Sequence, residues 1–167
     1  MSESALTLRP ARATDMAAIG EITARSWRHV YAGLLPDDFL SSLTPVAQQE
    51  RHERRFARGD VRYCVAEEGG QVIGFASWGP CRASGLSAGT ELYALYLRPG
   101  YERRGIGSRI FDRARAEIPA NQPGLYLTAL AMNPNRAFYR RHGGTEVAAP
   151  DIQLGGTSYP QIGFIWP

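Results

Sequence analysis

The chain has 167 residues, of which 44% are hydrophobic and 21% are charged. This length and composition are typical of one globular domain with a substantial core, and they exclude a disordered or fibrous protein. No apolar run approaches the roughly 18–20 residues that span a bilayer. The first residues also lack the apolar segment of a signal peptide. We therefore expect a cytoplasmic protein that binds no membrane.

All 19 basic residues are arginine, and the formal net charge is +3. The absence of lysine excludes a Schiff-base lysine or a lysine general base, whereas arginine can still bind phosphate through its forked guanidinium. The arginines within residues 51–58 are interleaved with Glu50 and Glu53. Such mixed charge is more typical of a solvated helix face than of a nucleic-acid surface, so we expect no nucleic-acid partner.

The cysteines and histidines are too few and too scattered to indicate a disulfide or a metal site. Cys64 and Cys81 fall in the two predicted strands of one hairpin, roughly 20 Å apart by strand rise. His29, His52 and His142 have no metal-ligand spacing, and each is interpreted as a surface residue. We therefore expect no metal cofactor.

Hydrophobic periodicity, cap residues and glycine or proline breaks predict alternating helices and strands. Strands are expected over residues 6–9, 61–67, 71–78, 90–97, 125–130, 145–148 and 159–166. Helices are expected over residues 16–32, 45–58, 105–118 and 134–142, with a short helical turn at 36–38. This order predicts an α/β sheet with antiparallel hairpins and helical crossovers, in a single domain spanning residues 1–167.

The stretch from Glu102 to Ser108 (ERRGIGS) carries the most chemical information. It joins a predicted strand to a predicted helix, where small residues let a phosphate approach unpaired backbone N–H groups. The absence of lysine rules out a Walker A loop, and the third glycine of a dinucleotide fingerprint is missing. On its own, this loop could equally be a helix N-terminus that needs room to pack.

Two longer blocks give this loop a context. One runs from Glu91 to Phe111 (ELYALYLRPGYERRGIGSRIF), and the other runs from Asn133 to Gly144 (NPNRAFYRRHGG). Together they resemble the GNAT (GCN5-related N-acetyltransferase) superfamily, in its acyl-CoA-binding strand, loop and helix and in its asparagine-led helix with a phenylalanine-tyrosine pair. Residues 8–27 and 159–167 are also similar to the family's first and last elements, so the resemblance covers nearly the whole chain.

The resemblance implies a mixed, mostly antiparallel twisted sheet flanked by helices and splayed between its fourth and fifth strands. It also implies acetyl-CoA as co-substrate, with the pantetheine arm added as a strand beside residues 95–97 and the pyrophosphate on the loop amides. The N–H of Leu97 would polarise the thioester carbonyl. The implied CoA-binding residues are Leu95, Tyr96, Leu97, Arg103, Arg104, Gly105, Ile106, Gly107, Ser108, Asn133, Arg136 and Phe138.

Two positions in these blocks have more than one interpretation. Glu102 stands where the family prefers glutamine or arginine, and a carboxylate facing the pyrophosphate would repel it. The Glu102 side chain can instead face solvent, with Arg103 and Arg104 as compensating charged donors. Asn133 can bond the pantetheine amides, cap its helix with Pro134 at the first helical position, or do both.

Tyr139 and Glu91 are the candidate proton-transfer residues. Tyr139 matches the family's tyrosine that faces the CoA sulfur, and it would protonate the leaving thiolate; the alternative is a core tyrosine. Glu91 begins its strand at a position that is acidic in many family members, and it would deprotonate the amine, directly or through water. The alternative is a solvated strand-end carboxylate. Strand alternation places Glu91 and Tyr93 on one face, where both could line an acceptor pocket.

Trp27, Tyr31 and Tyr93 are the candidate acceptor-binding residues. Trp27 and Tyr31 lie four residues apart and share a helix face, although Trp27 is more typical of a core residue. We expect direct acetyl transfer to an amine of a small molecule or peptide, without a nucleophilic cysteine or serine. A CoA-binding regulatory module without turnover is the alternative, and a homodimer is compatible with the resemblance.

Overall fold

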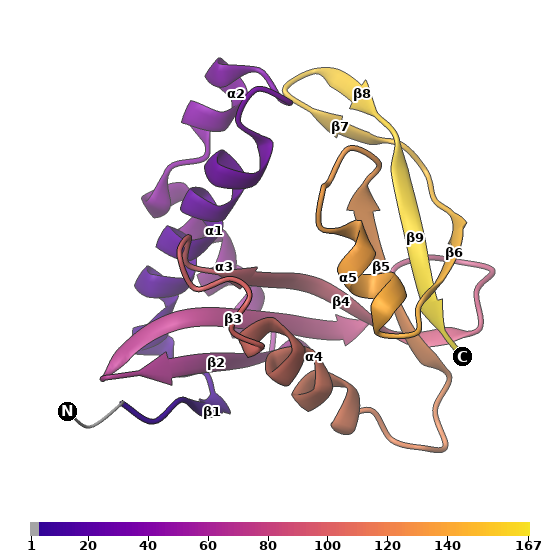
Figure 1. The fold of residues 1–167 in the computed structure, drawn as a ribbon. Coiled ribbons are helices and arrows are strands. Elements are labelled where there is room, and N and C mark those ends of the chain that lie inside the picture. The colour runs from indigo at the N-terminus through magenta and orange to yellow at the C-terminus, as the bar shows by residue number, and fades with distance from the viewer. Residues whose placement is uncertain (1–3) are drawn as a thin grey trace.

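The computed structural model describes residues 4–167. Its main sheet has the strand order β1-β2-β3-β4-β5-β9-β6, and its neighbouring pairs are antiparallel except β4 and β5 (Figure 1). The strands are β1 (Thr7–Pro10), β2 (Arg62–Glu68), β3 (Gln71–Pro80), β4 (Ala88–Leu97), β5 (Gly124–Leu130), β6 (Thr145–Ala148), β7 (Ile152–Leu154), β8 (Thr157–Tyr159) and β9 (Gln161–Trp166). The helices are α1 (Met16–Tyr31), α2 (Asp37–Ser42), α3 (Pro45–Ala57), α4 (Ile106–Ala116) and α5 (Arg136–Arg141). The predicted mixed, mostly antiparallel fold is confirmed.

The sheet lies between two layers of helices. The side chains of β2 alternate between the two faces of the sheet and therefore show which helices cover each face. Tyr63 and Val65 pack with apolar residues of α1 in one cluster. Cys64 and Ala66 pack with apolar residues of α4 in a second cluster, on the opposite face. α4 therefore packs on the face of the sheet opposite to α1, whereas the loop that leads into α4 reaches α1 through Arg98 and Glu102.

A close backbone approach holds α3 against α1. A Cβ added to Gly20 on α1 would stand 2.5 Å from the backbone nitrogen of Gln49 on α3, so any larger residue would separate the two helices. The start of α3 is fixed by Pro45 and by Thr44, whose hydroxyl accepts the Ala47 N–H at 3.2 Å. These contacts determine which face of α3 is turned toward the sheet.

The strands β4 and β5 are hydrogen-bonded only near their beginnings. Their parallel pairing covers residues 88–91 of β4 and 124–126 of β5, although both strands continue beyond these residues. A bulge leaves Tyr93 of β4 without an opposite residue on β3, and bulges increase local twist. Past the paired residues the strands diverge (Figure 1), which confirms the splay between the fourth and fifth strands.

Residues 152–159 form a hairpin that the sequence patterns did not predict. Gly155 and Gly156 join β7 to β8 with φ values of 57° and 81°, as in the tightest two-residue hairpin turns. The strand expected over residues 159–166 is consequently interrupted at Pro160 and divided between β8 and β9. Gly155 lies against Phe39 of α2, and α2 and the hairpin bridge the two halves of the molecule (Figure 1). We call α2 with the β7–β8 hairpin the arch.

The cysteines differ from expectation in one detail. Cys81 follows the last residue of β3 instead of lying within the strand, and both Cys64 and Cys81 are free thiols. Within residues 4–167, no helix is both long enough and apolar enough to cross a membrane.

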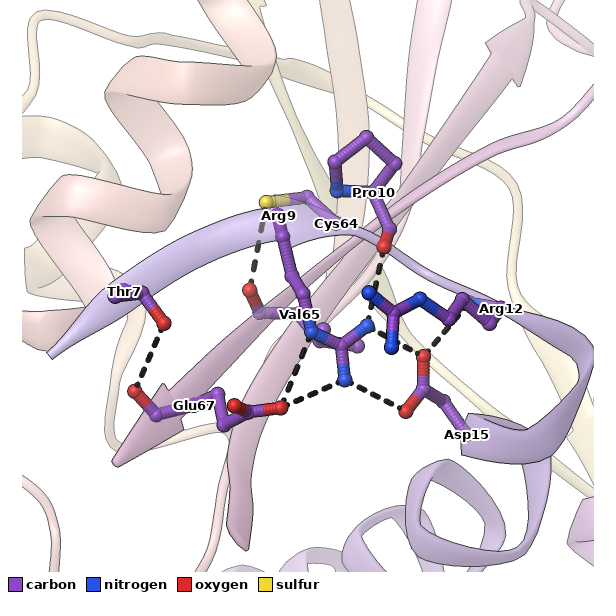
Figure 2. A network of polar contacts seen from close by, with 8 residues as sticks. All are labelled: Thr7, Arg9, Pro10, Arg12, Asp15, Cys64, Val65 and Glu67. Carbon is purple, nitrogen blue, oxygen red and sulfur yellow. Dashed lines mark hydrogen bonds and ion pairs between the residues drawn. The ribbon is translucent and has the colours of Figure 1, made fainter. Parts of the chain in front are cut away.

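One arginine ties the N-terminal strand to the start of α1 (Figure 2). Arg9 donates from its two terminal nitrogens to the Asp15 carboxylate at 2.8 and 2.9 Å, and from Nη2 and Nε to Glu67 at 2.8 and 3.1 Å. Asp15 also accepts the Arg12 N–H at 2.7 Å. The hydrogen bonds from Arg9 hold the pKa of Asp15 below its ordinary value. This network sets the position of α1 relative to β1 and β2.

Replacement of Arg9 by alanine is expected to lower the free energy of unfolding by about 2 kcal/mol, because the largely buried Asp15 loses its charged donors. Arg58→Ala is the control, since the Arg58–Asp60 pair is 60% and 42% exposed and should contribute less than about 0.5 kcal/mol. Denaturant titration measures both variants. Equal losses of unfolding free energy in the two variants would contradict a stabilising role for the Arg9–Asp15 pair.

The stability difference between the wild type and Arg9→Ala should also depend on pH, and the pKa of Asp15 determines the direction. The folded pKa of Asp15 lies below its ordinary value of 3.8. Its contribution to stability is therefore complete above that pH and is lost as the pH falls through the folded pKa. The advantage of the wild type over Arg9→Ala should shrink over this acidic interval.

Candidate active site

A cavity of about 410 Å³ opens where β4 and β5 diverge. β4 contributes residues 92–96 to its wall and β5 contributes residues 127–130. The rest of the wall comes from one face each of α1 and α3, from Arg82 after β3, from α5 and the residues before it, from the first residue of β9, and from the arch with Leu43. The cavity therefore lies beyond the last paired residues of the two strands.

The edge of β4 that faces β5 carries backbone groups that β3 does not use. The Arg98 N–H donates to the Ile73 carbonyl at 2.8 Å, which makes these two residues a hydrogen-bonded pair of the β3–β4 ladder. Because antiparallel pairs alternate, the N–H and C=O groups of Leu95 and Leu97 point away from β3 and toward β5. The Ser26 hydroxyl bonds the Leu97 carbonyl at 2.8 Å. Of these two residues, Leu95 lines the cavity and Leu97 does not.

The loop between β4 and α4 has the backbone shape of an anion cradle. Arg103 and Gly105 have φ values of 62° and 74°, and alternating left- and right-handed residues turn successive N–H groups toward one point. For Arg103 this conformation costs about 1–2 kcal/mol, a strain that is characteristic of functional sites. α4 begins at Ile106 without a side-chain cap, so the N–H groups of its first turn, which includes Ser108, are suited to an anion.

Glu102 is bonded outside this cradle. Its Oε2 accepts the Gly100 N–H at 2.7 Å, and its Oε1 lies 3.7 Å from Nε2 of His29 on α1. The Glu102 carboxylate therefore points away from the cradle and is not placed to repel an anion bound to the loop amides.

The other predicted residues of the loop lie in three different settings. Arg104 is ion-paired with Glu68 at 2.7 Å. The Ile106 side chain is buried in the core. Gly107 lies against Phe138, whose ring would be 3.6 Å from a Cβ at this glycine. The loop thus offers mainly its backbone to a ligand.

Tyr139 reaches the cavity from the C-terminal half of the molecule. Its ring packs against Phe164 and Trp166 of β9, at centroid distances of 5.4 and 6.4 Å. Burial raises the pKa of the Tyr139 hydroxyl, and the nearby Tyr96 raises it further. The hydroxyl therefore stays protonated at neutral pH, and the structure brings Tyr139 and Tyr96 to one cavity.

Asn133 lines the cavity but does not occupy the N-cap of α5. The N-cap residue is Asn135, and its N–H donates to Asn133 Oδ1 at 2.8 Å, as in an Asx-turn. The Arg136 Nε donates to the Asn133 carbonyl at 3.3 Å. Phe138 stacks on His142 at 4.1 Å between centroids. Of these predicted residues, the structure brings only Asn133 to the cavity wall.

Glu91 is 4% exposed and is bonded to Arg82. Arg82 donates from Nη2 to one carboxylate oxygen at 2.8 Å, and from Nε and its backbone N–H to the other at 3.0 Å. Arg82 lines the cavity and Glu91 does not. The bulge at Tyr93 interrupts the strand alternation, so Tyr93 lines the cavity without Glu91 beside it.

The three aromatic residues predicted for the acceptor all line the cavity. Trp27 Nε1 donates to the Tyr96 hydroxyl at 3.0 Å, and its ring lies 4.8 Å from that of Tyr31. Tyr31 is also part of the core beneath the arch. The Arg82 guanidinium lies 4.5 Å from the centroid of Tyr93. Trp27 therefore has a core contact and a place in the cavity wall.

The inner face of α3 is the part of the site that the sequence interpretation missed. The arginine-rich segment 51–58 was expected to be a solvated face, yet Gln48, Arg51, His52 and Arg55 all line the cavity. Their spacing of three and four residues is that of one helix face, and this was the available signal. Because the residues were polar, they were assigned to solvent, whereas they face a polar cavity.

His52 is buried, which corrects its interpretation as a surface residue. Thr23 donates its hydroxyl proton to the Ile19 carbonyl at 2.9 Å, so it accepts from His52 Nε2 at 3.0 Å. His52 Nδ1 then accepts from the Tyr63 hydroxyl at 2.9 Å. Burial, together with the neighbouring arginines, lowers the pKa of His52 to about 4. The imidazole is therefore neutral at physiological pH.

A cavity between diverging fourth and fifth strands, a cradle at the start of the next helix and a tyrosine across the opening define a GNAT-type fold. The GNAT acetyltransferase domain family matches residues 59–143. The chain belongs to this family.

Known proteins resemble the chain over different lengths. The uncharacterized N-acetyltransferase YuaI of Bacillus subtilis is 28% identical over 163 residues, which cover 97% of this chain and 93% of YuaI. The L-amino acid N-acyltransferase MnaT of Escherichia coli is 32% identical over 114 residues, 66% of this chain and 63% of MnaT. The PaiA N-acetyltransferase of Thermoplasma acidophilum, solved with coenzyme A, matches with a TM-score of 0.77 and 19% identity, over 95% of this chain and 98% of that one. This structural likeness shows the fold.

The bonded pair of Glu91 and Arg82 predicts a pattern of variant activities. Glu91→Gln and Arg82→Gln should each lower the rate of acetyl transfer by about tenfold, and the double variant should be no worse than either, because the two side chains act as one unit. Thiol release across a range of pH measures this. A far larger loss in Glu91→Gln alone, together with a changed pH profile, would mean that Glu91 itself takes the amine proton.

Proposed function

We propose that this protein transfers an acetyl group directly from acetyl-CoA to the amine of a small molecule. The observation that carries the proposal is the cavity between β4 and β5, which has strand N–H donors on one side and Tyr139 on the other. Transfer from a thioester needs backbone donors that bind the substrate and a proton donor for the leaving sulfur. The family membership and the coenzyme A bound to PaiA support acetyl-CoA as donor. The activity named for MnaT supports a small amine as acceptor.

The residues present fit acetyl-CoA as the donor substrate. The N–H of Leu97, which directly precedes the loop with the cradle, can pair with an amide of the pantetheine arm, as an added strand would. The amides of residues 103–108 can hold the pyrophosphate, with the exposed Arg103 as a charged donor. Asn133 lies on the cavity where the arm would pass, and Phe138 supports the cradle from behind Gly107.

The transfer itself needs two protein groups at the thioester. The N–H of Leu95, which lines the cavity, donates to the carbonyl oxygen as negative charge develops on it, in place of the predicted Leu97. The amine nitrogen forms a bond to the carbonyl carbon, the carbon–sulfur bond breaks, and Tyr139 gives its proton to the leaving sulfur. The proton that the nitrogen loses on becoming an amide balances the proton that Tyr139 gives. Neither cysteine lines the cavity, which favours direct transfer over an acyl-enzyme.

The role of Glu91 follows from its bonds to Arg82. A carboxylate whose two oxygens both accept from one guanidinium holds that guanidinium in place. Glu91 therefore positions Arg82 in the cavity wall. The sequence-based prediction that Glu91 removes the amine proton stays a prediction, and the Glu91→Gln and Arg82→Gln variants test it.

Replacing Tyr139 by phenylalanine should lower kcat by about 10- to 100-fold, because the thiolate then leaves without a proton donor. The dissociation constant of CoA should change less than about twofold, since the ring and its packing remain. Tyr159→Phe is the matched control, because Tyr159 belongs to the arch and does not line the cavity. An unchanged kcat in Tyr139→Phe would remove the residue from the donor role.

Replacing Arg103 by glutamine should raise the dissociation constant of CoA about fivefold and flatten its dependence on salt, because one charge-assisted bond to phosphate is lost. Titration calorimetry at two salt concentrations measures both effects. Arg54→Gln removes the same charge from the exposed side of α3 and should leave CoA binding unchanged. If both variants weakened CoA binding equally, the effect would be one of net charge only, and Arg103 would have no specific role in the phosphate cradle.

A further inference from the structure

The cavity wall carries arginine and no carboxylate. Arg51, Arg55 and Arg82 line it, and among residues 4–167 no aspartate or glutamate does. Arg82 is neutralised by Glu91 at 2.8 Å. In the described part of the chain, no acidic side chain forms an ion pair with Arg51 or Arg55. The acceptor end of the cavity is therefore positively charged.

The two arginines that lack an acidic partner converge on one place. Arg51 and Arg55 are four residues apart on the inner face of α3, so their side chains are neighbours. The Arg55 guanidinium lies 5.4 Å from the Tyr93 ring centroid, and that of Arg82 lies 4.5 Å from it. Burial lowers the pKa of Arg51, and the charges of Arg55 and Arg82 lower it further. Like charges held together in this way repel each other until an anion lies between them.

This anion is not the pyrophosphate of CoA. The phosphate cradle lies at the start of α4, and α4 packs on the face of the sheet opposite to α1 and α3. Arg51 and Arg55 line the cavity from α3, so a ligand bound to them lies on the α3 side of β4. The reactant that approaches the thioester from that side is the acceptor.

We infer, on the basis of the proposed function, that the acceptor is a small amine that also carries a carboxylate, which Arg51 and Arg55 bind. Two arginine forks match the geometry of a carboxylate. Binding at this end fixes the orientation of the acceptor, so that its nitrogen is presented to the carbonyl beside β4. The two residues set the specificity of the reaction.

The rest of the wall defines the size and polarity of the acceptor. Trp27, Tyr31 and Leu154 give the cavity aromatic and apolar surface, and Gln48 and Gln153 give it hydrogen-bonding groups. The volume of about 410 Å³ must also hold the thioester end of the donor. This combination suits a free amino acid with an apolar or aromatic side chain.

The same positive charge helps to activate the amine. An amine attacks only in its neutral form, and its ordinary pKa lies well above neutral pH. Positive neighbours disfavour the ammonium form and lower the pKa of a bound amine. The proton can then leave to water before the attack, and the wall needs no carboxylate as a base.

The first experiment compares matched acceptors that differ at the carboxylate. L-leucine and L-phenylalanine are each compared with their amides and with their decarboxylated amines, at equal concentrations of neutral amine, by the rate of thiol release from acetyl-CoA. The amino acids should have a kcat/KM at least about tenfold higher than their partners. Equal or faster turnover of the amides and decarboxylated amines would overturn the inference while leaving the proposed function intact.

The second experiment locates the carboxylate site. Arg51→Gln and Arg55→Gln should each raise KM for the amino acids at least about tenfold, with kcat changed less than about threefold. Turnover of the amides should fall less than about threefold, because the bound amine is activated less strongly, and the affinity for CoA should not change. Arg54→Gln is the control, because it lies on the same helix outside the cavity wall. An equal effect of Arg51→Gln on all acceptors would overturn the assignment.

A binding measurement separates this inference from the proposed function. The product N-acetyl-L-leucine is titrated into the CoA-bound protein by calorimetry, which needs no turnover. Its affinity should fall at least about tenfold in Arg51→Gln and remain unchanged in Arg54→Gln. Binding that is unaffected by Arg51→Gln would overturn the carboxylate site. Failure to bind CoA, or to acetylate any amine, would instead overturn the proposed function.

Discussion

The separation of β4 from β5 beyond residues 91 and 126 is the constraint on which the rest of the structure depends. Backbone donors that leave a ladder need new partners, and here they face a cavity instead of a neighbouring strand. The bulge at Tyr93 adds twist where the pairing ends. The arch then joins the two halves again at the far end. The opening is therefore a permanent feature of the fold, with strand donors on one side and Tyr139 on the other.

Three acidic residues around the site are each bonded to a partner of their own. Glu91 is held by Arg82, Glu68 pairs with Arg104, and Glu102 accepts from a backbone N–H. The cradle at the start of α4 and the inner face of α3 are two separate places, because α4 and α3 pack on opposite faces of the sheet. One suits the phosphates of a donor and the other suits a carboxylate, and the cavity between them is where the two reactants would meet.

The sequence predicted those parts of the molecule that local patterns encode. Periodicity and turn residues gave the strands of the main sheet, and the blocks around Gly105 and Tyr139 gave the class of site. The inner face of α3 could not be predicted in this way, because polar residues that line a cavity have the same pattern as residues that face water. His52 was misassigned for this reason. The β7–β8 hairpin was missed because three-residue strands carry almost no periodicity, although Gly155-Gly156 marked its turn.

The buried His52 adds no charge to the cavity wall over the physiological pH range. Its two ring nitrogens are used by Thr23 and Tyr63 in the neutral form, and a second ring proton would break the bond from Tyr63. With a pKa of about 4, it adds no charge beside Arg51 and Arg55 above that pH. A titration of activity near neutral pH therefore does not report on His52. The positive charge of the cavity wall comes from arginine side chains, which stay charged at any physiological pH.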